Sequence, residues 1–387
     1  MTSYFRRSQL CGAGLLAIFL ALPSAARAAP SDDTFACLAE DGRATIVVEG
    51  DYDYDRFHYT DPADTAIFDA RGARWSFQTF PTPKQNYPIS VKGGAANACW
   101  IGGLVVGTNP PTGGWREMYS AANGSGFNFG GGRSTEGFAL DGIRIHNVWD
   151  GIRPRGNTDD FHIENVWVTD ARDDCIENDH LQTGVVEDSL FEACHMGVSA
   201  RPGKGRGRDD AEAEDASEAA AQPAAAGDRV FEIRNTLISL GPHPKPNAKR
   251  ANYPWFKDPG HGMFFKLGPG DLQLKLYDNV FMLEQYPNNA KRTWGLPPEH
   301  YADLLADCSG NILVWLGEGE YPGPFHNDRF PDCWTVTTDR SVWERARQDW
   351  IDRHPQVARL PGDPQSYPER AIGLEAILES VRAAASG

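Results

Sequence analysis

The chain has 387 residues, a length that suits one elongated domain, and its formal net charge is −16. This acidic balance argues against nucleic acid as a partner. A hydrophobic content of 41% and an aromatic content of 11% are typical of a folded chain and argue against general disorder.

The N-terminus has the pattern of a cleaved export signal. Two arginines precede the apolar run LCGAGLLAIFLAL, which is too short to span a bilayer, and the cleavage pattern Ala26-Arg27-Ala28 follows. We therefore expect residues 1–28 to be a signal peptide and the mature protein, without a membrane span, to be periplasmic or secreted. An N-terminal membrane anchor is the alternative. Cleavage removes three arginines and no acid, which takes the net charge from −16 to about −19.

The mature chain retains an even number of cysteines, which permits disulfides in an exported protein. They are Cys37, Cys99, Cys175, Cys194, Cys308 and Cys333. We expect Cys308–Cys333 first, because it is a local pair, and Cys37–Cys99 next. The absence of a C-x-x-C pattern argues against a zinc site or a thioredoxin-like redox motif built on cysteine.

The first segments after the signal are rich in strand-forming residues and glycine. They span residues 44–52, 67–75 and 89–107. We interpret them as early, less regular coils of the repeat that follows.

Five short stretches share the order apolar, polar, Asn or Asp, small or β-branched, large apolar; they begin at residues 145, 163, 186, 233 and 277. A second set follows the first at residues 150–155, 174–179, 196–201 and 261–266. It places Ile152, Ile176 and Val198, which we expect to point inward, at intervals of about 23 residues. Such a period with two short strands per repeat predicts a coil that stacks on itself. The recurring Asn fits a polar ladder between coils.

The step from Val198 to Met263 is longer because it contains two inserts. Residues 203–228 are rich in alanine and charge and are predicted to be disordered, and residues 241–260 form a long proline-rich loop. Residues 308–319 are predicted to form a terminal strand. Residues 341–354 and 369–384 have the apolar spacing of amphipathic helices, which we expect to cap the last coil or pack beside it.

The I-x-N-V and D-x-I-x-x-D repeats resemble those of the right-handed parallel β-helix of the pectin-lyase-like superfamily, clearly over residues 138–285 and loosely over 36–137. The resemblance implies an all-β fold, a single-stranded parallel β-helix over residues 29–340, with a C-terminal helical segment at 341–387. That superfamily includes lyases, hydrolases, epimerases and non-catalytic adhesins, so the fold does not select a reaction.

Two motifs are similar to those of polygalacturonase-type hydrolases, Asn157-Thr158-Asp159-Asp160 and Asp173-Asp174-Cys175, although their spacing is shorter than in that family. The family's Gly-His-Gly motif is present only as His195-Met196-Gly197, and its final Arg-x-Lys is absent.

Strand alternation predicts that Ile176 points into the coil and that Cys175, Glu177 and Asp179 point outward. Stacked coils then place side chains in two outward columns. The first is Arg153, Glu177, Ser199 and Phe264, and the second is Arg155, Asp179, Arg201 and Lys266. Acids on one coil would lie between bases on its neighbours. The pattern indicates either a ladder of cross-strand ion pairs or a binding cleft.

In the cleft interpretation, carboxylates would bind Ca²⁺ and basic and aromatic side chains would bind an acidic polysaccharide. The Ca²⁺ ligands would be Asp173, Asp174, Glu177 and Asp179, and the substrate-binding residues would be Arg153, Arg155, His180, Tyr253 and Trp255. The resemblance implies a polysaccharide lyase in which Ca²⁺ acidifies the substrate and a base removes a proton. We assign the catalytic residues as Lys266, Arg201, Asp174 and His195. Positive neighbours of Lys266 are expected to lower its pKa.

Two alternatives stay open. A glycoside hydrolase would use Asp159 or Asp160 with Asp173 or Asp174 as its carboxyl pair, although Gly156-Asn157 also favours a simple turn there. A non-catalytic β-helix would bind polysaccharide or support the cell envelope. In each case we expect a monomer, and we expect Trp149 and Trp167 to stack in the core.

Overall fold

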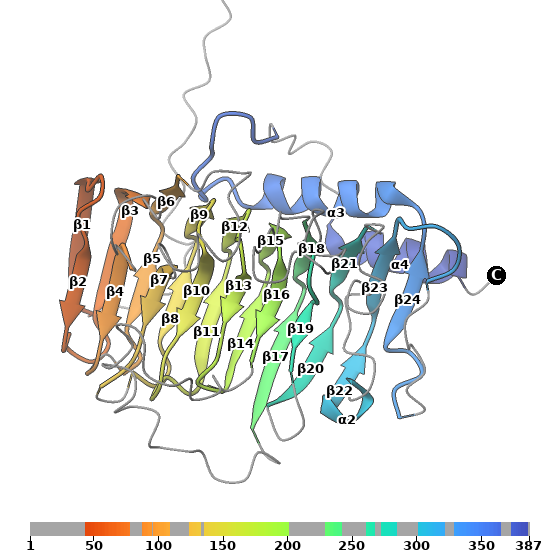
Figure 1. Ribbon diagram of the computed structural model, residues 1–387, viewed down its shortest axis with the longest axis horizontal. Coiled ribbons are helices and arrows are strands. Elements are labelled where there is room, and N and C mark those ends of the chain that lie inside the picture. The colour runs from red at the N-terminus through yellow and green to blue at the C-terminus, as the bar shows by residue number, and fades with distance from the viewer. Residues whose placement is uncertain are drawn as a thin grey trace, which may run out of the picture. The chain divides into compact units, whose positions relative to one another are not determined.

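Parallel strands that stack in chain order make up most of the molecule (Figure 1). The computed structural model describes residues 43–77, 87–94, 96–108, 124–132, 135–200, 229–241, 261–267, 272–284, 301–321, 329–364 and 373–385. The chain divides into two units, Met1–Ser31 and Asp32–Gly387, and all described residues belong to the second. The expected signal peptide and the insert at 203–228 lie outside the described residues. No helix in the described ranges has the length and apolar character needed to cross a bilayer.

The strands of the described residues form one sheet of 17 strands and one of seven, and every pairing is parallel. They recur along the chain in three series. The first series is β5 (Cys99–Ile101), β8 (Ala139–Asp141), β11 (Phe161–Glu164), β14 (Gly184–Glu187), β17 (Val230–Arg234), β20 (Gln273–Tyr277) and β22 (Leu305–Ser309). The second series is β6 (Leu104–Gly107), β9 (Arg144–His146), β12 (Trp167–Thr169), β15 (Leu190–Cys194), β18 (Leu237–Leu240), β21 (Val280–Leu283), β23 (Asn311–Trp315) and β24 (Trp334–Thr337).

The third series is the seven-stranded sheet, formed by β2 (Phe57–Thr60), β4 (Ile89–Lys92), β7 (Ser125–Phe129), β10 (Asp150–Pro154), β13 (Asp174–Glu177), β16 (Met196–Ser199) and β19 (Phe265–Lys266). At the start of the unit, β1 (Thr45–Asp51) pairs along the long strand β3 (Ile67–Phe77), which in turn pairs with both β5 and β6. The early segments are therefore coils, as the sequence predicted. This arrangement is solenoid-like and compatible with a parallel β-helix.

The predicted inward stack is confirmed for its first three members. Ile152 pairs with Ile176 and Ile176 with Val198, and all three are buried. The next member is Phe265 rather than Met263, because the chain bends at Phe264 and both phenylalanines enter the core. Each coil buries its apolar face only against its neighbours, so the core runs continuously along the stack.

The polar residues at the coil corners adopt left-handed backbone conformations. Asn165, Asp188, Asn235 and Asp278 all have positive φ where the first series passes into the second. Asn147 also has positive φ but lies where the second series passes into the third. Asn147 and Asn165 therefore occupy different corners, which explains their short interval of 18 residues. Asn and Asp tolerate this conformation better than other residues with side chains.

Two C-terminal helices, α3 (Arg340–Arg353) and α4 (Leu374–Ala385), cover the outer face of the second series; a short helix, α2 (Tyr301–Leu304), precedes β22. α3 lies across several coils rather than at the end of the last one (Figure 1). Trp350 packs edge-on against Trp167, with ring centroids 5.7 Å apart. Trp149 and Trp167 are both buried, as predicted, and Trp167 lies under the helix. They follow different corners of the coil, so their positions are not equivalent.

The disulfide Cys308–Cys333 is confirmed. A second disulfide, Cys175–Cys194, was not predicted. Cys99 is also disulfide-bonded, and its expected partner Cys37 lies outside the described residues. Disulfides persist in oxidising compartments, so these bonds support a location outside the cytoplasm. The predicted terminal strand is β23, but β24 pairs beyond it.

Candidate functional site

The outer face of the third series carries acidic and basic side chains, and in β13 (Asp174–Glu177) it departs from strict alternation. Cys175 and Ile176 are consecutive residues of β13, and both are buried in the core. Gly151 in β10 is the counterpart of Cys175 in the neighbouring coil. A Cβ atom at Gly151 would lie 2.8 Å from Cγ1 of the core residue Val168, so this position also faces the core. The expectation that Cys175 points outward is therefore wrong; it is paired with Cys194 inside the coil. Because Cys175 and Ile176 both point inward, Asp174 lies on the outer face together with Glu177.

Three aspartates from adjacent coils converge on this face. Asp150, Asp173 and Asp174 each offer a carboxyl oxygen within 4.8 Å of the others. The backbone N–H of Asp174 donates to Asp150 Oδ1 at 3.1 Å. Asp150 and Asp174 are each only 1% exposed, whereas Asp173 is half-buried. Within the described part of the chain, Asp150 Oδ2 and Asp174 Oδ1 receive no hydrogen bond from an N–H or O–H group. We call these three residues the acid cluster.

Burial and mutual repulsion favour protonated carboxyls in the acid cluster. Burial raises the pKa of Asp150 well above its usual range, and the neighbouring Glu177 and Asp174 raise it further. Burial also raises the pKa of Asp174, although Lys266 opposes this shift. Burial likewise raises the pKa of Glu177, although Arg153 opposes this shift. Asp150 and Asp174 therefore hold a proton to higher pH than exposed aspartates do.

Basic side chains lie on both sides of β13. Arg153 Nε is 3.3 Å from Glu177 Oε2, and Arg153 Nη1 donates to the hydroxyl of Tyr87 at 2.7 Å. Lys266 Nζ lies 3.6 Å from Asp174 Oδ2. The predicted alternation of acids between bases is thus present, and Glu177 opposes Ser199, which opposes Lys266.

The assignment of Lys266 to the second outward column is wrong. Lys266 occupies the first column, at the position predicted for Phe264, because the register is displaced by two residues at the Phe264 bend. The expected pKa shift is also wrong in direction. Asp174 is the largest influence on Lys266 and raises its pKa, so this amine retains its proton.

The other predicted residues lie around the same face. Asp179 accepts a hydrogen bond from Ser199 Oγ at 2.7 Å. Burial, with Arg153 and Arg155 nearby, lowers the pKa of His180 to about 4, so its imidazole is neutral. Arg155 is buried at the end of the strand, and His195 is buried just before β16. Arg201, Tyr253 and Trp255 lie outside the described residues.

Asp159 and Asp160 form a turn and bond away from the acid cluster. Asp159 accepts hydrogen bonds from Thr183 N at 2.8 Å and from Arg229 Nη2 at 2.5 Å. Asp160 has a φ of 61° and also contacts Thr183. The residue that joins Asp173 and Asp174 is instead Asp150, which sequence reasoning missed. The signal was present, because D-G-I-R at 150 and D-C-I-E at 174 occupy the same place in successive repeats.

No protein-family model, curated protein or solved structure matches this chain. The interpretation of the acid cluster therefore rests on its own geometry and chemistry.

Proposed function

We propose that the protein is an exported carbohydrate-active enzyme, a glycoside hydrolase on a single-stranded parallel β-helix of the pectin-lyase-like type. The three recurrent strand series and the disulfides support this fold and location. The observation that carries the proposed reaction is the acid cluster, in which three carboxyls lie together and two of them are buried.

Glycoside hydrolysis needs a carboxylic acid that protonates the leaving oxygen and a carboxylate that activates water or stabilises the positive transition state. A proton held by Asp150 or Asp174, whose pKa values are both raised, would supply the first group. Asp173 is half-buried, and its carboxylate makes no hydrogen bond with the described residues, so we assign it the second role. The basic side chains beside the cluster favour an anionic polysaccharide as substrate.

A Ca²⁺-assisted lyase is the second candidate, because clustered carboxyl oxygens without N–H or O–H donors also suit a hard cation. Asp150, Asp173 and Asp174 would hold the ion, since Glu177 is paired with Arg153 and Asp179 accepts from Ser199. Bound Ca²⁺ would neutralise a substrate carboxylate. A lyase also needs a base, and the raised pKa of Lys266 makes that lysine a poor one. The hydrolase is therefore the better supported reaction.

The test is product analysis on a panel of acidic and neutral polysaccharides, with and without EDTA. The hydrolase predicts new reducing ends, no ultraviolet absorbance from unsaturated products, and activity that survives EDTA. Asp174→Asn should lower the rate by about 10²–10⁴-fold, the usual contribution of acid–base catalysis. Asp160→Asn is the matched control, since Asp160 lies in the turn away from the cluster, and it should retain activity.

Unsaturated products that require Ca²⁺ would replace the hydrolase with the lyase. Glycan binding without turnover would indicate a non-catalytic binding protein. Equal activity of Asp174→Asn and the unsubstituted protein would show that the acid cluster does not take part in the reaction.

A further inference from the structure

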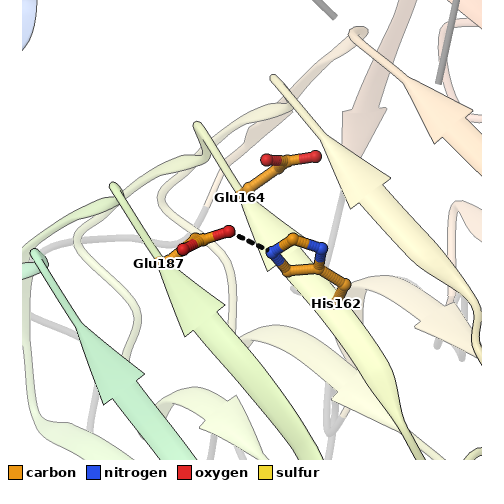
Figure 2. A group of neighbouring side chains, drawn as sticks. All are labelled: His162, Glu164 and Glu187. Carbon is orange, nitrogen blue, oxygen red and sulfur yellow. Dashed lines mark hydrogen bonds and ion pairs between the residues drawn. The ribbon is translucent and has the colours of Figure 1, made fainter. Parts of the chain in front are cut away.

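A second group of potential ligands lies on the outer face of the first series, on a different sheet from the acid cluster. His162 and Glu164 are two residues apart in β11, so they project from the same side while Phe161 and Ile163 enter the core. Glu187 lies directly opposite Glu164 on the adjacent strand β14. Figure 2 shows the three side chains gathered above these two strands.

The atoms of these three residues that could bind a metal ion already lie close together. One ligand atom from each of the three residues lies within 4.8 Å of the others, and His162 Nε2 is 2.6 Å from Glu187 Oε1. Ligands bound to one Zn²⁺ ion at about 2.0–2.2 Å lie roughly 3–3.5 Å apart. The pairing of the two strands fixes the backbone positions, so the adjustment needed to bind an ion falls on the side chains.

The surrounding contacts orient one ligand and leave another available. Arg234 Nε lies 2.5 Å from Glu187 Oε2 and fixes this carboxylate while its Oε1 faces His162. Such outer contacts commonly orient metal ligands. Among the described contacts, no hydrogen bond or ion pair engages the carboxylate of Glu164, which Figure 2 shows beside the other two.

The local charge also favours a dication. Glu164 and Glu187 belong to the group, and Glu232 lies close to it. Arg234 contacts both Glu187 and Glu232. The carboxylates therefore outnumber the guanidinium that contacts them, which favours a bound cation.

We propose that His162, Glu164 and Glu187 bind one Zn²⁺ ion, with water in the remaining position, and thereby link adjacent coils. One imidazole nitrogen and two carboxylate oxygens are a zinc ligand set, whereas Ca²⁺ prefers oxygen ligands alone. Three protein ligands on a partly exposed face leave a coordination position open. The site is independent of the hydrolase proposal, because it shares no residue with the acid cluster.

The test is titration of the metal-stripped full-length protein, made without a histidine tag, with Co²⁺ as a spectroscopic probe for Zn²⁺. We expect saturation at one equivalent with a visible ligand-field spectrum that Zn²⁺ abolishes and excess Ca²⁺ does not. His162→Ala and Glu164→Gln should each weaken binding by more than about tenfold. Glu164→Gln is the variant least able to disturb folding, since its carboxylate makes no hydrogen bond with the described residues.

His146→Ala is the matched control. His146 is also a half-buried strand histidine near a carboxylate, with Nδ1 3.4 Å from Asp170 Oδ2, but it belongs to neither ligand group. It should bind Co²⁺ as the unsubstituted protein does. Failure of the unsubstituted protein to bind Co²⁺, unchanged affinity in either His162→Ala or Glu164→Gln, or an equal loss in His146→Ala would each overturn the proposal.

Discussion

The outer faces of the second and third series differ although the same coils build both. On the second series, outward residues such as Trp167, Leu190 and Leu237 are apolar and buried beneath α3 and α4. On the third series, the equivalent row carries Arg153, Glu177 and Lys266. The inward core supports both faces, so the outward residues alone decide whether a face becomes packing surface or a polar site. The comparison indicates that scaffold and candidate chemistry occupy separate sides of each coil.

The largest stability effect is expected where the helix meets the second series. Trp350 is fully buried, packs on Trp167, and donates from Nε1 to the carbonyl of Asp188 at 2.8 Å. Trp350→Ala should lower the free energy of unfolding by about 3–5 kcal/mol, measured by urea denaturation. Val336→Ala, at a side chain that is 40% exposed, should change it by less than about 0.5 kcal/mol. Equal effects of the two substitutions would mean that α3 does not cover this face in solution.

A smaller effect is expected in the acid cluster, where a substitution should raise the free energy of unfolding rather than lower it. The pKa of Asp150 is raised in the folded protein, so the folded state binds a proton that the unfolded chain releases. Stability attributable to this group is therefore lost as pH rises above the unfolded pKa of about 3.9. Asp150→Asn keeps a donor toward Glu177 without a charge, and its advantage in unfolding free energy should grow with pH. A constant difference from acidic to alkaline pH would show that folding does not raise the pKa of Asp150.

The smallest effect concerns an ion pair at the margin of the helix. Arg347 pairs with Glu192 and its guanidinium lies 5.8 Å from the Trp167 ring. Because both side chains are partly exposed, Arg347→Ala should cost no more than about 1 kcal/mol. A cost equal to that of Trp350→Ala would assign the stability of this face to charge rather than to apolar packing.

The sequence was informative about the scaffold because burial repeats with the coil. The spacing of Ile152, Ile176 and Val198 predicted their stacking, and the tail pattern predicted both helices. It was less informative about where the outer apolar face lies. Trp167 follows the same motif as Trp149, and only the structure shows that α3, much later in the sequence, covers it.

The candidate site was predicted in part. Acids between bases were expected on one face, and Asp173, Asp174, Glu177 and Lys266 do lie there. The errors came from local departures from alternation. Consecutive inward residues at Cys175 and Ile176, and the bend at Phe264, moved side chains in ways that a period of two cannot represent. Sequence reasoning missed the proposed zinc ligands because Glu164 and Glu187 become neighbours only through strand register.

The most direct test of the account is infrared spectroscopy of the carboxyl groups, because the proposed reaction depends on a proton held by the acid cluster. The account predicts that the protein retains a protonated-carboxyl absorption at neutral pH and that Asp150→Asn removes or weakens it, while Asp160→Asn leaves it unchanged. A neutral-pH spectrum without that absorption, or one that is identical in Asp150→Asn, would contradict the account.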